Sequence, residues 1–482
     1  MNDNQLILTL FGATGDLAAR KLYPAIYRLY KNNNISDKFA VIGTARREWT
    51  NEYFREIVYN SILEEITDEE NAKEFVSHFY YQPHDVNDGE HYNKLKELSD
   101  TLDKQYNIGG NRIYYISLNP QLFPVITHHL SAQNVLTDNG YNRLIIEKPF
   151  GFDEESAIEL QQQLTESFDE NQIYRIDHYL GKELVSSLDK LRYNNIWSQL
   201  WSNEFIDNIQ ISLAEDMGIS ERGAYYDNSG VTKDMIQNHM MQILSILAMD
   251  NPKNASADGF RQEKINAIKS LRTFENTEDL TANVIRAQYT ANTAEGIVGY
   301  KEEADIPADS QTETYFAAKF DFEMPRWEGV PFFVRSGKRL EGKYTTIHIV
   351  FKKDDPNVEN NYLRIEFAPE MRIQFFFNQE KPGHKGGAKS VPMTFKYPTE
   401  VESEIPHDYE RLINACINNQ LDHFVHWYEA QYAWQFMDHI HNYWKQLDGQ
   451  DMKYYKALST GPVEADELMK AHHTKWYDCK DC

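Results

Sequence analysis

Cysteine is scarce in this chain of 482 residues, with only Cys416, Cys479 and Cys482 present. Three cysteines cannot build a disulfide framework, so we expect a reducing compartment and a cytoplasmic location. No uninterrupted apolar run approaches the ~18 residues of a transmembrane helix. The opening residues, MNDNQLILTLFGATG, also lack the basic segment of a signal peptide. We therefore expect neither export nor membrane insertion.

Positive charge is also under-represented, since 49 Lys and Arg face 74 Asp and Glu, which gives a formal net charge of −25. Such a surface repels nucleic-acid phosphates and anionic membranes, so we expect neither as a partner. It repels small phosphorylated ligands as well. Any anion site must therefore be a local cluster of basic side chains.

The length suggests two or three domains, and the hydrophobic patterns change partway along the chain. Strands are predicted at 6–11, 39–43, 78–82, 112–118, 143–147 and 172–177, with helical segments such as 16–31 between several of them. This alternation is typical of a doubly wound parallel sheet of the Rossmann type. Later strands, at 206–213, 315–322, 332–335, 345–351, 363–367 and 372–377, follow without regular helices.

We therefore predict a dinucleotide-binding domain at 1–177. A larger α+β domain is predicted at 178–482, built on a mostly antiparallel sheet. Two long helices are predicted in it, at 230–249 and 423–445.

The first strand runs directly into the sequence GATGDLA, residues 12–18. In this dinucleotide-binding pattern Gly12 permits a tight turn, Gly15 permits close approach of a pyrophosphate, and small Ala18 allows helix–strand packing. The following helix offers free N–H groups to an anion. The alternative is a plain strand-to-helix turn.

The second strand ends in GTARR, which places Arg46 where NAD-binding enzymes usually carry an acid. A guanidinium there suits the 2′-phosphate of NADP, so the sequence favours NADP and leaves NAD use open. A solvated basic pair on a loop is the alternative.

Two segments carry candidate substrate residues. Glu147-Lys148-Pro149 follows a predicted strand, at the edge where open parallel sheets bind ligands. In RIDHYLGKE, residues 175–183, His178, Tyr179 and Lys182 can donate to a phosphate near a helix N-terminus. The alternative for the second segment, when it is read alone, is a structural strand-to-helix corner.

His239 lies on a predicted helix, in one stripe with Met235, Gln242 and Ile246. A histidine on such a face is more often a core residue than a catalyst. A carboxylate such as Asp177, if it reached the ring, would fix the tautomer and stabilise the imidazolium, as in a His–Asp pair.

With these motifs in place, the chain resembles the glucose-6-phosphate dehydrogenase family, and among its members the shorter bacterial type. The resemblance rests on GATGDLAARKLYP, NRLIIEKPFG, RIDHYLGKE, AEDMGISERGAYYDNSG, DMIQNHMMQ, PRWEGVPFFVRSGKRL and DYERLINA, which span nearly the whole chain. RIDHYLGKE is close to diagnostic, whereas the glycine turn and the EKP tripeptide are not.

The resemblance implies oxidation of D-glucose 6-phosphate at C1 to 6-phospho-D-glucono-1,5-lactone, the first step of the oxidative pentose phosphate pathway. It implies a homodimer, with 178–482 as the domain that binds substrate and dimerises. It implies His239 as general base and Asp177 as its partner. The implied substrate contacts are Lys148, His178, Tyr179, Lys182, Glu215, Asp234, Lys338, Lys343 and Lys21. The implied cofactor contacts are Gly12, Ala13, Thr14, Gly15, Asp16, Leu17, Arg46, Lys148 and Tyr115.

Two other functions compete with this one. A sugar oxidoreductase of the inositol or glucose–fructose type shares the Rossmann domain and the EKP turn but lacks RIDHYLGKE. A non-catalytic NADP sensor would have no need of a general base. Hydride transfer needs no metal, and Cys479-x-x-Cys482 is interpreted as a mobile tail in preference to a zinc site.

Overall fold

The computed structural model describes residues 4–193, 196–254, 256–380, 388–398 and 404–477. The chain divides into two compact units: one holds Met1–Glu183, Asn254–Arg261 and Pro406–Gln431, and the other holds Leu184–Lys253, Gln262–Ile405 and Tyr432–Cys482. Within the described ranges, no helix combines the length and the apolar character that crossing a bilayer requires. Cys479 and Cys482 lie outside these ranges.

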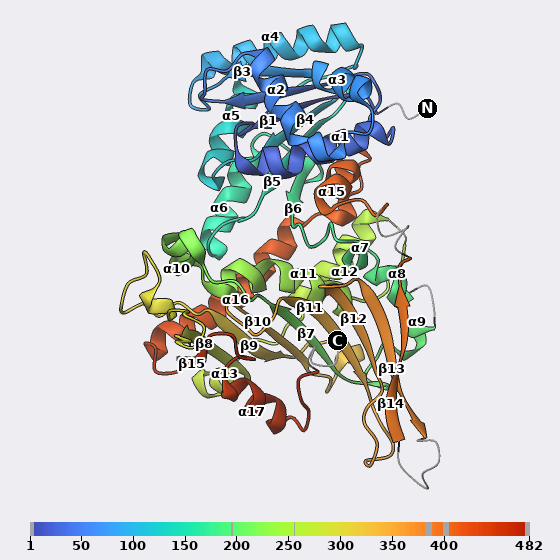
Figure 1. The fold of residues 1–482 in the computed structure, drawn as a ribbon, viewed down its shortest axis with the longest axis vertical. Coiled ribbons are helices and arrows are strands. Elements are labelled where there is room, and N and C mark those ends of the chain that lie inside the picture. Colours follow the sequence, from blue (N-terminus) through green and yellow to red (C-terminus); the bar gives the residue numbers. More distant parts are fainter. Residues whose placement is uncertain (1–3, 194–195, 255, 381–387, 399–403, 478–482) are drawn as a thin grey trace. The chain divides into compact units, whose positions relative to one another are not determined.

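The first unit contains a six-stranded sheet in the order β3-β2-β1-β4-β5-β6, and every neighbouring pair is parallel. This order confirms the predicted Rossmann-type sheet. The central strand β1 is buried along its whole length because helices cover both faces (Figure 1). The strands are β1 (Leu6–Phe11), β2 (Phe39–Ala45), β3 (Phe79–Pro83), β4 (Arg112–Ile116), β5 (Asn142–Glu147) and β6 (Ile173–Ile176).

The connecting helices begin where the sequence supplies side-chain caps. The Asp153 carboxylate accepts a hydrogen bond from the Ser156 N–H at 2.9 Å, and Asp88 caps the following helix through the Glu90 N–H at 2.9 Å. The helices are a π-helical turn η1 (Ala18–Leu22), α1 (Tyr23–Lys31), α2 (Asn51–Ser61), the turn η2 (Leu63–Glu65), α3 (Glu69–Ser77), α4 (Gly89–Tyr106), the turn η3 (Pro120–Leu122), α5 (Phe123–Ala132), α6 (Glu154–Thr165) and the turn η4 (Glu170–Gln172).

A late segment of the chain completes this unit. Helix α15 (Asp408–Ile417) contributes Leu412, Ile413 and Cys416 to the same hydrophobic core as β1 and β2. The Arg28 guanidinium on α1 pairs with Glu410 at 2.8 Å. Arg143 donates to the carbonyls at the end of α15, at 2.6 and 2.8 Å. The Rossmann core of this protein therefore includes residues from beyond position 400.

The second unit contains a nine-stranded sheet in the order β14-β13-β12-β11-β7-β10-β9-β8-β15. All its pairs are antiparallel except β7–β10 and β8–β15, which confirms the mostly antiparallel prediction. The strands are β7 (Ile206–Ala214), β8 (Val284–Thr290), β9 (Tyr315–Phe320), β10 (Phe332–Gly337), β11 (Tyr344–Phe351), β12 (Tyr362–Ala368), β13 (Arg372–Glu380), β14 (Ala388–Lys396) and β15 (Lys453–Lys456).

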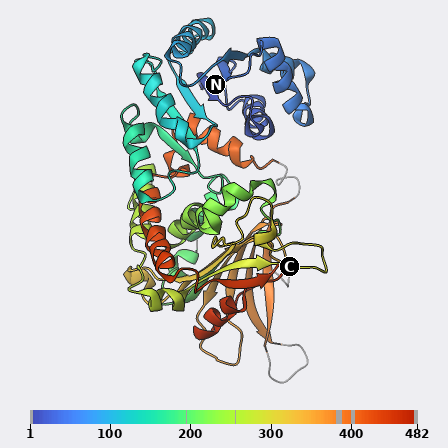
Figure 2. The ribbon, with the colours of Figure 1, turned by 90° about the vertical axis from the view of Figure 1, so that its left-hand side faces the viewer.

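Alternate residues of β9 contact helices on opposite faces of this sheet. Phe316 and Phe320 pack on rings of α16, with the Phe320 and Phe436 centroids 5.0 Å apart. Tyr315 and Ala317 face the core that includes α17. In both views α11 and α16 lie on one side of the sheet and α17 on the other (Figures 1 and 2). The helices are α7 (Glu183–Ser186), α8 (Leu188–Tyr193), α9 (Trp197–Leu200), the turn η5 (Ser220–Arg222), α10 (Gly223–Val231), η6 (Thr232–Met240), α11 (Met241–Ala248), α12 (Ala257–Lys269), α13 (Thr277–Asn283), the turns η7 (Tyr300–Glu302) and η8 (Pro325–Trp327), α16 (Trp427–Leu447) and α17 (Val463–Ala471).

The predicted helix 230–249 differs from the observed one at its start and in its winding. Gly230 has φ +62°, so the helix that follows begins at the next residue. Glu313 accepts hydrogen bonds from the first two N–H groups of that helix. Its backbone carbonyl accepts from the Val231 N–H at 3.0 Å, and its carboxylate accepts from the Thr232 N–H at 3.1 Å. Although η6 is π-helical, Met235, His239, Gln242 and Ile246 of the expected stripe are all buried.

The predicted helix 423–445 also starts later than expected, at Trp427. Leu421–His423 forms a separate 3₁₀ turn (η9) instead. Val425 then forms an isolated antiparallel bridge with Arg175 of β6. An extended residue that pairs with a strand cannot belong to a helix, so the helix begins only after this bridge.

Gly230→Ala should destabilise the second unit by roughly 3 kcal/mol or more, because an added Cβ would lie 2.2 Å from the Glu313 carboxylate and φ is positive. Gly329→Ala is the matched control. Gly329 has φ +76° but nothing within 4 Å of its Cβ position, so only about 1 kcal/mol of backbone strain is expected. Denaturant unfolding of both variants measures the difference, and equal losses would contradict the steric argument.

Candidate functional site

The glycine turn of the first unit is fixed from two sides. The N–H groups of Gly12 and Ala13 donate to the Thr44 carbonyl of β2, at 2.9 and 3.1 Å. Gly12 has φ +93°, and a Cβ there would lie 2.4 Å from the Ser117 carbonyl oxygen beyond β4. Only glycine fits this position. Thr14 is half-buried, whereas Gly15 and Asp16 are exposed, so this side of the turn is open to a ligand.

Arg46 lies at the same edge of the sheet as the glycine turn. In the parallel pairing of β1 with β2, Phe11 stands opposite Thr44, so the residues after both strands emerge together. The Arg46 side chain is exposed. Its neighbour Arg47 is placed over the Trp49 ring at 5.6 Å. Arg47 is exposed as well, so the two arginines differ in this ring contact and not in exposure.

Sequence reasoning missed the segment after β3, which lies beside Arg46. The His84 N–H donates to the Ala45 carbonyl at 2.8 Å. The pKa of Asp85 is lowered, mainly by hydrogen bonds from Asn87 and to a smaller extent by Arg46. The available signal was its place after the third strand, since strand ends in a parallel sheet share one edge.

Lys148 and Asp177 follow neighbouring parallel strands. Glu147 of β5 pairs with Ile176 of β6, so the next residue of each strand leaves the sheet at the same level. Asp177 is buried, whereas Lys148 is half-buried. The peptide bond before Pro149 is cis. Tyr115 is fully buried, and its hydroxyl donates to the Glu147 carboxylate at 2.5 Å, so its phenol is already engaged.

The candidate phosphate-binding residues form one compact turn. The Asp177 carboxylate accepts from the Tyr179 N–H at 2.9 Å, which holds the turn against the end of β6. The Lys182 ammonium lies 3.7 Å from the centre of the Tyr179 ring, and the rings of His178 and Tyr179 are 5.0 Å apart. An imidazole, a phenol and an ammonium therefore gather within five residues.

Gly181 keeps this turn close to the start of α15. A Cβ at position 181 would lie 2.7 Å from the Asp408 carbonyl oxygen. A larger residue would push the turn away from the helix. The conformation of the His178–Lys182 turn therefore depends on α15.

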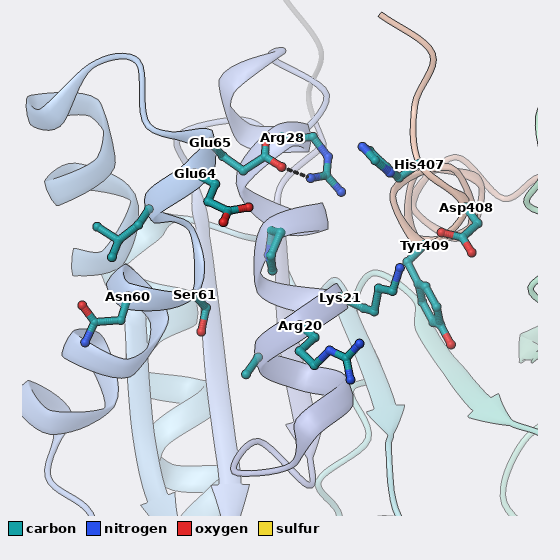
Figure 3. A pocket seen from close by; sticks show the side chains of 13 residues that line it. Arg20, Lys21, Arg28, Asn60, Ser61, Glu64, Glu65, His407, Asp408 and Tyr409 are labelled. Carbon is teal, nitrogen blue, oxygen red and sulfur yellow. Dashed lines mark hydrogen bonds and ion pairs between the residues drawn. The ribbon is translucent and has the colours of Figure 1, made fainter. Parts of the chain in front are cut away.

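Lys21 lines a cavity of about 610 Å³ between η1, α1, the end of α2, η2 and the start of α15 (Figure 3). Its exposed side chain extends toward Tyr409. Arg28, deeper in the cavity, is engaged by Glu65 at 2.5 Å and Glu410 at 2.8 Å. The three basic and three acidic side chains of the lining cancel in formal charge: they are Arg20, Lys21, Arg28, Glu64, Glu65 and Asp408.

In the second unit, three predicted substrate residues come together. Strands β7 and β10 are parallel, and Ala214 pairs with Gly337, so Glu215 and Lys338 emerge side by side. The Glu215 N–H donates to the Gly337 carbonyl at 3.0 Å. The Lys338 ammonium pairs with the Glu215 carboxylate and, at 3.2 Å, with that of Asp234 on η6.

The electrostatics of this cluster favour a charged lysine. Burial alone would lower the pKa of Lys338, but the carboxylates of Asp234 and Glu215 outweigh that effect and raise it. The Lys338 ammonium also lies 5.4 Å from the centre of the Tyr226 ring. Two carboxylates and one ammonium form an arrangement that can accept from, and donate to, sugar hydroxyls.

The other two predicted site residues of this unit, His239 and Lys343, differ in burial. His239 lies one π-helical turn after Asp234 and is 1% exposed. Lys343 is exposed just before β11. No contact between Lys343 and the Lys338 cluster is found among the described residues, so its proposed role receives no support from the geometry.

Lys338→Met should destabilise the folded protein by about 2 kcal/mol at pH 8, because Glu215 and Asp234 would be left as an uncompensated pair of carboxylates. Because these carboxylates raise the pKa of Lys338, its stabilising contribution is present below the ordinary lysine pKa of ~10.5 and is lost as the pH rises above that value. The difference in stability between the variant and the wild type should therefore shrink at strongly alkaline pH, which thermal unfolding of both proteins measures. A loss independent of pH would rule out the electrostatic explanation.

Residues 9–187 match the family model "Glucose-6-phosphate dehydrogenase, NAD binding domain", and residues 190–477 match "Glucose-6-phosphate dehydrogenase, C-terminal domain". The chain is 42% identical to a glucose-6-phosphate 1-dehydrogenase of Streptococcus pneumoniae, over 98% of this chain and 97% of the relative. It is 38% identical to the Leuconostoc mesenteroides enzyme of the same name, over 99% of each.

A solved glucose-6-phosphate dehydrogenase in complex with its substrate glucose 6-phosphate superimposes with a TM-score of 0.92, at 29% identity over 98% of this chain and 99% of that one. The chain belongs to the glucose-6-phosphate dehydrogenase family of oxidoreductases.

Proposed function

We propose that this protein oxidises D-glucose 6-phosphate at C1 to 6-phospho-D-glucono-1,5-lactone and passes the hydride to NADP. The observation that carries the proposal is the joint presence of the Lys338–Glu215–Asp234 cluster and the His178–Tyr179–Lys182 turn. One set suits sugar hydroxyls, and the other suits a phosphate. The solved relative that holds glucose 6-phosphate supports this choice of substrate.

The turn at Gly12–Leu17 fits a dinucleotide, because its tight backbone leaves no space for a Cβ at Gly12 and exposes Gly15 and Asp16. We assign Gly12, Ala13, Thr14, Gly15, Asp16 and Leu17 to its pyrophosphate. When bound, the nicotinamide accepts the hydride that leaves C1. Arg46, exposed beside the turn, is assigned to the 2′-phosphate, which favours NADP over NAD.

His239 is the proposed general base. Its imidazole takes the proton of the C1 hydroxyl as the hydride departs, which avoids a costly oxocarbenium ion. Asp177 is the proposed partner that fixes the tautomer and stabilises the imidazolium. The two residues belong to different units, so their pairing is part of the proposal.

The remaining residues bind and orient the sugar. His178, Tyr179 and Lys182 hold the phosphate, and binding energy gained there is used to position C1. Glu215, Asp234 and Lys338 hold sugar hydroxyls. Lys148 contacts both sugar and cofactor, and Lys21 and Lys343 are further basic contacts to the substrate.

We further propose a cytoplasmic homodimer formed through the nine-stranded sheet. Met393 and Phe395 of β14 are 63% and 51% exposed, which leaves apolar surface near the edge of that sheet. Cys416 is a free, buried thiol, in keeping with a reducing compartment.

His239→Asn should lower kcat for glucose 6-phosphate by about 10²–10⁴-fold with little change in KM, because the base acts in the chemical step while binding groups remain. Initial rates of NADPH formation measure kcat and KM of the variant, and thermal unfolding checks that it is folded. The same rates are measured for the wild type with glucose as a second substrate. Near-normal turnover in the variant would refute the role of His239. Equal wild-type rates on glucose would refute the phosphate requirement.

Arg46→Ala should raise KM for NADP by at least tenfold and leave KM for NAD nearly unchanged, because only NADP carries the 2′-phosphate. Arg47→Ala is the matched control, since that guanidinium stacks on Trp49. It should alter neither constant appreciably. Equal effects of Arg46→Ala on the two cofactors would remove Arg46 from the phosphate site.

A further inference from the structure

The carboxylate of Glu147, next to the proposed ligand Lys148, is held between two tyrosine hydroxyls. Tyr115 of β4 donates to it at 2.5 Å. Tyr409, in the first turn of α15, donates a second hydrogen bond. None of the roles proposed so far uses this carboxylate or explains why two phenols are directed at it.

Strand register explains how the three side chains meet. Tyr115 pairs with Ile145 across the β4–β5 ladder, and Glu147 lies two residues further along the same face of β5. Helix α15 covers this face, since its Leu412 and Ile413 share a core with Tyr115 and Ile145. Tyr409 therefore approaches Glu147 from the helix, opposite the strand that carries Tyr115.

The cluster is best satisfied when Glu147 is ionised. Both phenols have raised pKa values because they are buried, so they remain protonated donors. A carboxylate accepts both hydrogen bonds without a competing proton. Burial nevertheless raises the pKa of Glu147 to about 7, and Asp177 adds to this rise; the hydrogen bonds from Tyr115 and Tyr409 and the charge of Lys148 oppose it. The ionised state therefore depends on these partners.

We propose that Glu147 is a positioning residue: as a carboxylate clamped by Tyr115 and Tyr409, it fixes the end of β5 and thereby the direction in which Lys148 leaves the strand. The proposal rests on the proposed function, which assigns Lys148 to the sugar and the cofactor. The clamp also joins two parts of the site, because Tyr409 lines the cavity that holds Lys21 (Figure 3).

Three substitutions test the clamp by steady-state kinetics with glucose 6-phosphate and NADP. Glu147→Gln keeps the shape but removes the charge, and it should lower kcat/KM by about 10–100-fold, mostly through KM, because a misplaced ligand weakens positioning. Tyr115→Phe and Tyr409→Phe should each cause a smaller loss in the same direction. They also keep the test open if Glu147→Gln folds poorly.

Tyr114→Phe is the matched control. Tyr114 is a neighbouring buried tyrosine on the other face of β4, where its hydroxyl donates to the Val135 carbonyl at 3.1 Å. Its loss removes a buried hydrogen bond of the same kind, remote from Lys148. Kinetic constants close to wild type are expected for this variant, even if its stability falls.

The pH dependence gives a readout that a merely structural role would not produce. Only ionised Glu147 positions Lys148, so the kcat/KM of the wild type should fall as the pH drops through about 7. The Glu147→Gln variant lacks this ionisation, so its kcat/KM should depend on one proton fewer.

The raised pKa of Glu147 has the opposite effect on stability. A carboxyl whose folded-state pKa is raised stabilises the fold fully below its ordinary pKa of ~4.5, and this contribution is lost as pH rises through about 7. Thermal unfolding of Glu147→Gln should therefore vary less between pH 4.5 and 7 than that of the wild type.

The outcomes separate the two levels of proposal. A wild-type protein that does not reduce NADP with glucose 6-phosphate would overturn the proposed function itself. An active wild type, together with a Glu147→Gln variant of unchanged KM and unchanged pH profile, would overturn the clamp alone. Equal losses in Tyr115→Phe and the Tyr114→Phe control would also count against it.

Discussion

Parallel strand pairing is the constraint that brings the candidate residues of each unit together. Strands that run in the same direction end at the same edge, so residues far apart in sequence emerge together. In the first unit this brings the Gly12 turn beside Arg46, and Lys148 to the level of Asp177. In the second unit, the parallel pair β7–β10 stands within a mostly antiparallel sheet and joins Glu215 to Lys338. A one-residue slip in either ladder would separate these groups.

The return of the chain through α15 is the second organising feature. Arg28 forms an ion pair with this helix and Arg143 donates hydrogen bonds to it, so both guanidinium groups bind the helix and not a ligand. Gly181 is small because the backbone at Asp408 passes within reach of its missing side chain. In a chain of net charge −25, an anion site depends on a local group of donors, such as the side chains gathered in the His178–Lys182 turn.

Much of this arrangement could be predicted from sequence because it is recorded in local patterns. Apolar runs such as LILTLF and RLIIE located the parallel strands, and the glycine turn followed directly from the strand before it. The short strands β8 and β15 were missed because VIRAQYT and KYYK carry polar residues that pair only in the fold, as Arg286 does with Asp451 at 2.6 Å. Register and ion pairing of this kind leave no periodic signal.

The same reasoning placed most candidate residues but not their partners. Gly230 was predicted to lie within a helix. Its positive φ could not be predicted, because the Glu313 carboxylate beside it is 83 positions away in the sequence. The resemblance implied Tyr115 as a cofactor contact, which stays a prediction, but its hydrogen bond to Glu147 could not be predicted because it depends on the register of two strands. Burial and long-range contacts, which decide both cases, are properties of the folded chain.

The discontinuity of the first unit has a consequence for biosynthesis. Its Rossmann core includes residues 406–431, which leave the ribosome long after the six strands. A nascent chain that ends near residue 180 would expose the apolar surface that α15 later covers, including the faces around Tyr115 and Ile145. Chains released early are therefore expected to require chaperones and to aggregate, whereas completion of the nucleotide-binding unit must wait until nearly all of the chain has been translated.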